Sequence, residues 1–320
     1  MPVNRRPLLI IALIVSAYAL ASWLAFSSRQ LEWLQIVSIS FIYTLPCSVG
    51  ALVCFLGYKL DRPSQFWAYF APALSMLLLG LCSWLLWMEA LLCVVVATPV
   101  LMIMAFVGGL IMSLILKRAD RGRLSMTFFV LLPYAVSPIE QMWQAPHETR
   151  IMRNAVAIKA TPQMVWDHIY QVPAIQRSEL PAQWIYVIGF PRPLAAVIDR
   201  PGVGGRRHAT FERDVSFFEV VTTWEPQHKL SFTIKADPDF IPHTAFDRHI
   251  IVGGRFYDVL DGTYEIEPRE DGTCVLHLSS THRLSTRLNW YAGWWSEWVM
   301  DQVQGSILEV IRKRCEARAS

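Results

Sequence analysis

Ser280 and His282 are the residues whose type and spacing could most readily do chemistry. They continue the alternation of Leu276 and Leu278. Because successive side chains of a strand point to opposite faces, all four should share one inward face if the leucines face the core. The alternative is that Ser280 and His282 lie at the solvent-exposed end of the strand.

An inward His282 could serve as a general base, with Asp258 or Glu265 as its acidic partner. Nothing in the sequence brings either acid to the imidazole, so His282 is only a weak catalytic candidate. Whether the protein is an enzyme stays open at this level.

Other candidates lie on a neighbouring strand and on the C-terminal segment. Tyr264 should point inward, where it belongs either to the core or to a cavity wall. Gln302 and Ser306 fall within the apolar stripe of the C-terminal segment, where a polar group meets either a buried partner or a ligand. The alternative for these two is a half-buried flank. Trp295 and Trp298 of the same segment complete this set.

Several kinds of site have no support. The sequence contains no nucleophile elbow, phosphate-binding loop or paired-carboxylate signature. Its six cysteines form no CxxC pair, zinc spacing or disulfide framework. His243, Asp247 and His249 could be imagined as metal ligands, but their spacing in a proline-containing loop at 240–253 does not favour this. We expect no metal and no cofactor, and the loop could instead be a lid.

Net charge gives no support for nucleic-acid binding. The overall charge of +3 divides into +4 for residues 1–143 and −1 for the remainder. All eight histidines follow residue 144. The first part of the chain therefore has the composition of a membrane region and the second that of a soluble domain.

A run of strands and one long helix must position the candidate residues. A short strand at 155–160 and a helix after Thr161-Pro162 come first, and turn signals divide 202–283 into further strands. Asp261-Gly262 and Asp271-Gly272 predict tight hairpins. Residues 289–317 predict a long amphipathic helix with a polar side formed by Glu297, Asp301, Gln304 and Arg312. Because such a sheet needs one face covered, we expect this helix to cover it.

The N-terminal part predicts membrane spans. Four uncharged runs exceed the ~20 residues that a helix needs to cross a bilayer. Gly108 and Gly109, with Ser113, could allow close packing between these helices. A fifth span is marginal, because its run is short and contains two prolines. The predicted helices are 7–28, 33–58, 63–88, 90–116 and 124–143.

Basic residues at the ends of these runs predict the orientation. Arginines and lysines precede the first span and follow the second and fourth, which favours the cytoplasmic side for those loops. Five spans would place the C-terminal domain outside, in the periplasm if this is a bacterial inner-membrane protein. If residues 124–143 do not cross, that domain is cytoplasmic.

Four stretches of the second half carry a family resemblance: IKATPQMVWD (158–167), GVGGRR (202–207), EVVTTWEP (219–226) and KLSF (229–232). Together they resemble the START-like superfamily, also called SRPBCC, which includes polyketide cyclases/dehydrases and lipid-transfer proteins. The resemblance implies an α+β helix-grip fold over 155–320, after a linker at 144–154. In such a fold a curved antiparallel sheet wraps a long C-terminal helix around a hydrophobic cavity. Arg207 fits a Gly-x-Gly-x-x-Arg-like stretch, although its default role is a salt bridge or a turn contact.

We expect a membrane-anchored domain that binds a lipid or another apolar small molecule, with transfer or sensing as the roles that such binding could serve. One alternative is a cyclase or hydrolase acting on a polyketide-like or lipidic substrate, with His282 as base. Another is a structural domain whose interior is filled by its own tryptophans. The candidate ligand-binding residues are Arg207, Tyr264, Ser280, His282, Trp295, Trp298, Gln302 and Ser306.

Overall fold

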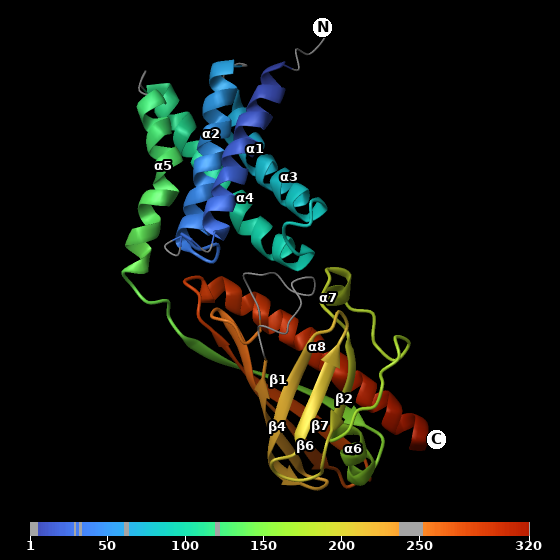
Figure 1. Ribbon diagram of the computed structural model, residues 1–320. Helices are drawn as coiled ribbons and strands as arrows, with labels where there is room; N and C mark the ends of the chain where they lie inside the picture. Colours follow the sequence, from blue (N-terminus) through green and yellow to red (C-terminus); the bar gives the residue numbers. More distant parts are fainter. Residues whose placement is uncertain are drawn as a thin grey trace. The chain divides into compact units, whose positions relative to one another are not determined.

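The chain divides into two compact units, Met1–Ala145 and Pro146–Ser320. The computed structural model describes residues 6–28, 30–31, 34–60, 64–118, 122–236 and 252–319. Within these residues the first unit is helical and the second contains the β-sheet (Figure 1). The predicted lid and its histidines at 240–253 lie almost entirely outside the described residues.

Four described helices of the first unit are long and apolar enough to cross a membrane. Two of them begin with a short π-helical turn, which leads into α2 and α3 respectively. The second begins at Ser40 rather than at the predicted residue 33. The four helices are Arg6–Ser27 (α1), Ser40–Leu60 (ending in α2, Leu45–Leu60), Phe66–Leu85 (ending in α3, Ala71–Leu85) and Leu91–Arg118 (α4).

Helices α2 and α4 are in backbone contact, which only glycine permits. A Cβ on Gly50 would overlap the carbonyl group of Ala105, and one on Gly108 would overlap that of Cys47. The close packing expected at Gly108 is therefore confirmed, and its partner is α2. In a membrane, such closeness replaces the hydrophobic driving force that packs helices in water.

The fifth helix, α5 (Gly122–Gln141), is continuous through its two prolines and runs beside α2. Ser48 Oγ donates to the carbonyl oxygen of Phe129 (2.6 Å), and Glu140 accepts the backbone N–H of Ser40 (3.0 Å). Unlike the other four, α5 does not meet the apolarity that marks a span. The fifth crossing at 124–143 stays a prediction.

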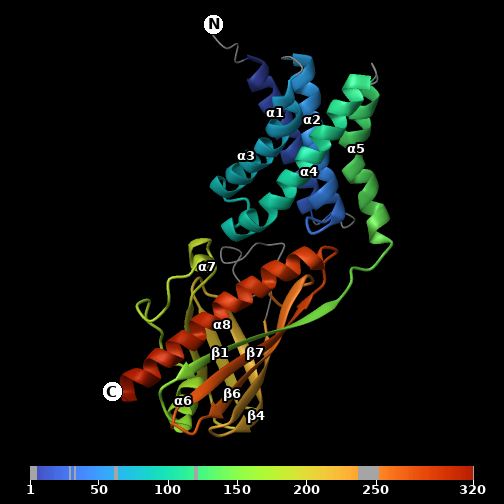
Figure 2. The same cartoon turned by 180° about the vertical axis from the view of Figure 1, so that it is seen from behind.

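The second unit contains one seven-stranded antiparallel sheet in the order β1-β7-β6-β5-β4-β3-β2. The first strand pairs with the last, so β1 and β2 are the edges. Figures 1 and 2 show the curled sheet wrapped around one side of α8. The elements are β1 (Glu148–Ile158), α6 (Pro162–Ile169), α7 (Trp184–Val187), β2 (Pro193–Ile198), β3 (Arg206–Phe211), β4 (Ser216–Glu225), β5 (Lys229–Lys235), β6 (Tyr257–Pro268), β7 (Cys274–Leu284) and α8 (Asn289–Ala319).

Strand β1 begins at Glu148, inside the stretch expected to be a linker at 144–154. The expectation was wrong for most of that stretch because the partly buried face of β1 is polar there. Arg150 pairs with Glu297 of α8 (2.7 Å), and Asn154 donates to the carboxylate of Asp301 (3.1 Å). A strand can therefore alternate between exposed and partly buried residues even where the partly buried ones are polar, because residues of the covering helix pair with them.

Asp261-Gly262 does not form the predicted hairpin, whereas Asp271-Gly272 does connect β6 to β7. Strand β6 continues through Asp261, with only a bulge between Val259 and Asp261. Gly262 is needed for packing, because a Cβ there would overlap the ring of Phe232. At Gly272 a positive φ of 77° suits the turn.

Helix α8 packs against β1, β7 and α6. Asn289 fixes its first turn: Asn289 Oδ1 accepts from the backbone N–H of Thr286 (2.8 Å), and its Nδ2 donates to the carbonyl of Pro146 (3.0 Å). The predicted polar side was wrong for Gln304, which is buried on the side facing the sheet. The unit is thus a curved sheet closed by its C-terminal helix, the helix-grip arrangement that was predicted.

Candidate functional site

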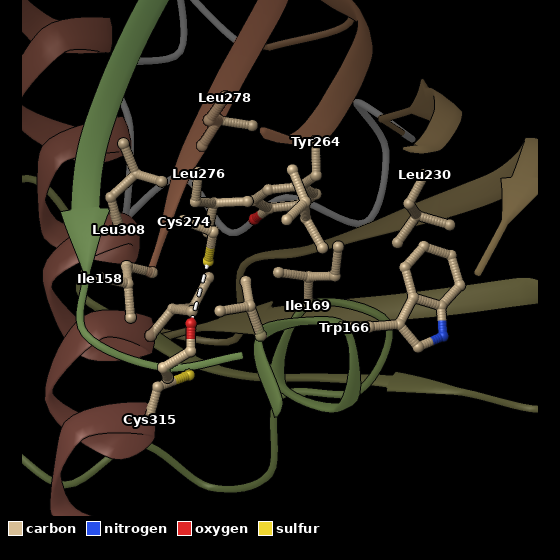
Figure 3. Close-up of a cluster of buried hydrophobic side chains, with 14 of the residues drawn as sticks. Ile158, Trp166, Ile169, Leu230, Tyr264, Cys274, Leu276, Leu278, Leu308 and Cys315 are labelled. Carbon is tan, nitrogen blue, oxygen red and sulfur yellow. Dashed lines mark hydrogen bonds between the residues drawn. The ribbon is translucent and has the colours of Figure 1, made fainter. Parts of the chain in front are cut away.

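The interior between β7 and α8 has an apolar end. We define this apolar end as Ile158, Ile266, Leu276, Leu308 and Ile311, each at most 2% exposed. Figure 3 shows three of these side chains, Ile158, Leu276 and Leu308, together with Cys274, whose thiol donates to the carbonyl of Ala160 (3.4 Å). Helix α6 adds Trp166 to the same cluster. This end is filled by the protein's own side chains.

The same strand and helix also build a polar end, which we define as Ser280, His282, Ser296 and Gln304. All four are buried. Gln304 Nε2 donates to Ser280 Oγ (2.5 Å), and His282 Nε2 lies 3.1 Å from Ser296 Oγ. The inward direction predicted for Ser280 and His282 agrees with this burial. The two α8 residues were not among the predicted candidates.

Hydrogen bonding assigns the tautomer of His282. Ser296 Oγ donates its hydrogen to the carbonyl of Gly293 (3.0 Å), so towards His282 it acts as an acceptor. With the hydroxyl hydrogen directed at the Gly293 carbonyl, the His282 proton lies on Nε2 and Nδ1 presents a bare lone pair. Burial lowers the pKa of His282 below its usual value, which keeps the ring neutral.

His282 is separated from both acids considered as its partners. Val259 is the inward cross-strand neighbour of His282, so Asp258 points to the other face of β6, and Glu265 is exposed on that face. The ring instead lies near Tyr257, with 5.8 Å between ring centroids. Among the described residues, no carboxylate is hydrogen-bonded to His282, and the imidazole lacks the orienting acid of a catalytic dyad.

Arg207 forms a second buried polar group, with Glu219 of β4. The two are cross-strand neighbours on the inner face, 3% and 6% exposed, and form an ion pair. Arg207 Nη2 also donates to the carbonyl of Ile169 (3.2 Å). Burial raises the pKa of Glu219, and the guanidinium opposes that rise. The salt-bridge role considered for Arg207 is the one observed.

Two aromatic rings surround this ion pair. The Arg207 guanidinium carbon lies 5.3 Å from the Phe232 ring centroid and 6.0 Å from that of Tyr264. Burial raises the pKa of the Tyr264 phenol, against the lowering effect of Arg207. Arg207 and Tyr264, predicted separately, are therefore brought together. Glu219 was missed, although its alternation with Val221 was a signal that it faces inward.

The remaining predicted residues lie along α8. Trp295 and Trp298 contact each other edge to face, with ring centroids 5.8 Å apart. Ser306 Oγ donates to Gln183 Oε1 (2.7 Å), just before α7, so it faces that connection. Gln302 is partly buried and donates to Asp301 (3.3 Å). None of these four side chains is hydrogen-bonded to Ser280, His282, Ser296 or Gln304 by a bond described here.

Some buried polar atoms of this interior have no partner. Native proteins leave few such atoms, so each calls for an explanation such as a ligand or an ordered water. At the polar end they are two acceptors. These two atoms are His282 Nδ1 and Gln304 Oε1.

Metal ligation finds no support in the described part of the chain. No group of three or more His, Cys, Asp or Glu side chains there could hold a metal ion. His243, Asp247 and His249, which were weighed as ligands, lie outside the described residues.

No family model and no curated protein matches this sequence. Solved structures resemble its C-terminal part. Norcoclaurine synthase from Thalictrum flavum, in complex with dopamine and hydroxybenzaldehyde, is 14% identical with a TM-score of 0.34, over 54% of this chain and 90% of its own. The di-domain aromatase/cyclase StfQ of the steffimycin pathway is 12% identical with a TM-score of 0.35, over 64% and 61%. A protein of Nitrosospira multiformis is 15% identical with a TM-score of 0.32, over 53% and 99%.

These scores are low, and the fold is established by the strand order and the register themselves. An antiparallel sheet whose first and last strands are neighbours curls around the helix that follows the last strand. Residues Pro146–Ser320 therefore form a helix-grip fold.

Proposed function

We propose that this protein is a membrane-anchored binding protein for a lipid or another apolar small molecule, held between the sheet and α8. The observation that carries the proposal is the set of unpartnered polar atoms in an otherwise apolar interior. Ligand sites combine apolar walls with a few polar groups that fix orientation. In this proposal the ligand occupies the polar end, because the apolar end is filled.

The four apolar helices support the anchoring part of the proposal. A bilayer is itself a source of apolar ligands, and a tether keeps the binding domain at high local concentration near that source. A binding role is also favoured over acid–base catalysis, since the described structure gives His282 no acidic partner.

Two neighbouring serines of β7 offer a matched test. Ser280 is buried at the polar end, whereas Ser279 is its outward-facing neighbour. The full chain would be purified in detergent as wild type, Ser280→Leu and Ser279→Leu, then extracted with solvent, and the released small molecules quantified by mass spectrometry. We expect a ligand from wild type and Ser279→Leu, and its loss from Ser280→Leu.

The membrane helices can also retain lipid, so the difference between the two variants is decisive. Equal recovery of every extracted compound from both would contradict a site in the helix-grip interior. Circular dichroism of each variant would establish that the extra leucine has left the fold intact.

The location of the C-terminal domain is a separate part of the proposal. We propose that α5 crosses a bacterial inner membrane and places Pro146–Ser320 in the periplasm. Alkaline phosphatase, which is active only outside the cytoplasm, and green fluorescent protein would each be fused after Ser320. Phosphatase activity without fluorescence is expected, and the reverse pattern would place the domain in the cytoplasm.

A further inference from the structure

The polar end contains two buried hydrogen-bond acceptors that have no partner within the protein. His282 presents the lone pair of Nδ1, because its only proton is used towards Ser296. Gln304 presents Oε1, because its Nε2 is used towards Ser280. Both acceptor atoms are buried and unpartnered. An unpaired buried acceptor is unfavourable, and a ligand removes that cost by supplying a donor.

The two acceptors belong to one place in the fold. Ser280 and His282 are two residues apart on the inward face of β7, so their Cα atoms are separated by about 7 Å. Ser280 holds Gln304 and Ser296 holds His282, which ties both acceptors to the seam between β7 and α8. A single hydroxyl could satisfy either acceptor.

The cations in and beside this interior are already paired with carboxylates of the protein. The Arg207 guanidinium is paired with Glu219, and the Arg150 guanidinium with Glu148 and Glu297. A carboxylate or phosphate would meet two acceptor lone pairs at the polar end and would find both cations already paired. Burying an unpaired charge is far more costly than burying a paired polar group.

We propose that the ligand is uncharged and reaches the polar end with a hydroxyl or another hydrogen-bond donor, as an alcohol, a phenol or a neutral lipid with a free hydroxyl would. This selectivity rests on the proposed function, since it names the chemical class that the same site accepts. Anionic lipids and free fatty acids are disfavoured.

Three probes of equal chain length separate the possible ligand chemistries. Dodecanol has a donor, dodecyl methyl ether has only an acceptor, and dodecanoate is an anion. The full chain in detergent would be incubated with an equimolar mixture of the three, separated from free micelles and extracted. Mass spectrometry would give the amount of each probe retained, relative to protein-free micelles.

For the wild type we expect dodecanol to be retained roughly tenfold better than the ether, the ratio that one additional hydrogen bond of about 1.4 kcal/mol produces. Dodecanoate should be retained least. His282→Phe and Gln304→Met each remove one acceptor while keeping an apolar side chain of similar size. Each should lower the alcohol-to-ether ratio without lowering retention of the ether.

Ser306→Ala is the matched control. Ser306 is also buried on α8, but its hydroxyl is paired with Gln183 away from the polar end. This variant should keep the wild-type ratio. If one acceptor variant fails to fold, the other variant and the wild-type preference still test the proposal.

Three outcomes would overturn the inference, and they differ in whether they also contradict the proposed binding function. Equal retention of alcohol and ether by the wild type means that water or another protein group satisfies the acceptors; the binding function then survives and the selectivity does not. Preferential retention of dodecanoate means that the site is cationic, which also leaves the binding function in place. Retention of no probe above the micelle background would contradict the proposed function as well.

Discussion

The two ends of the helix-grip interior are built by the same strand and the same helix, yet they differ in how completely they are filled. At the apolar end, side chains of β7 and α8 meet one another with no polar atom left over. At the polar end, four buried polar residues pair in twos and leave two acceptors unmet. The filled and the incompletely paired arrangements therefore lie on successive turns of α8.

The Arg207–Glu219 pair lies in the same interior and differs from both ends, because it is a buried ion pair in which each charge has its partner. Arg207→Met should cost about 3–5 kcal/mol, because it leaves the Glu219 carboxylate buried without its cation. The double variant Arg207→Met/Glu219→Leu should recover most of that loss. Hydrogen exchange of the β3 and β4 amides, read by mass spectrometry, would report both changes. A double variant as unstable as the single would mean that the pair stabilises by more than mutual neutralisation.

The apolar end should respond strongly to loss of volume. Leu276→Ala and Leu308→Ala each leave a cavity among fully buried neighbours, and we expect a loss of about 2–5 kcal/mol. Leu194→Ala on β2 is the control, because that side chain is 40% exposed and its loss should cost roughly 0.5 kcal/mol or less. Urea unfolding followed by proteolysis of the C-terminal unit would measure the three. Equal effects at Leu276 and Leu194 would remove the distinction between core and surface.

The polar end should be far more tolerant. Gln304→Met removes one hydrogen bond to Ser280 but also removes an unmet acceptor, so we expect a net change within about 1 kcal/mol of zero. The same urea series would measure it. A loss as large as that of Leu276→Ala would show that this end belongs to the stabilising core.

The pH dependence of stability should change least, and its sign follows from the burial of His282. Because the pKa of His282 is below its ordinary 6.5 in the folded chain, the unfolded chain binds more protons as pH falls below about 6.5. His282 should therefore lower stability on acidification and have no effect well above that pH. The loss in unfolding midpoint between pH 7.5 and pH 5.5 should be smaller in His282→Phe than in the wild type. An equal loss would show that His282 keeps its ordinary pKa.

The Asp261-Gly262 turn signal wrongly divided β6, but much of the rest of the fold could be predicted from the sequence, because β5, β7 and α8 carry regular patterns. The edges of the sheet could not. Strand β2 begins at Pro193, a residue that normally argues against a strand and is tolerated here because β2 is an edge. Of β1, only the end at 155–158 was predicted, because the earlier part has a polar inner face whose partners are residues of α8 far along the chain.

The candidate site was predictable only in part, for a related reason. Strict alternation along β7 placed Ser280 and His282 inward, since a strand has only two faces. Gln304 could not be assigned in the same way. A glutamine in a long helix can face water or a buried serine, and its residue type does not distinguish the two. Its hydrogen bond to Ser280 depends on how α8 packs against β7, which the sequence alone does not give.

The pairing of β1 with the end of the chain has a consequence for biosynthesis. Arg150 and Glu297 are 147 residues apart in sequence. The contacts between β1 and α8 therefore cannot form until α8 has been synthesised. Until α8 is made, its future contact surface on the sheet stays uncovered, and such unsealed sheets are prone to aggregate. We therefore expect nascent chains stalled before residue 289 to recruit chaperones, and chains released after residue 319 to escape them.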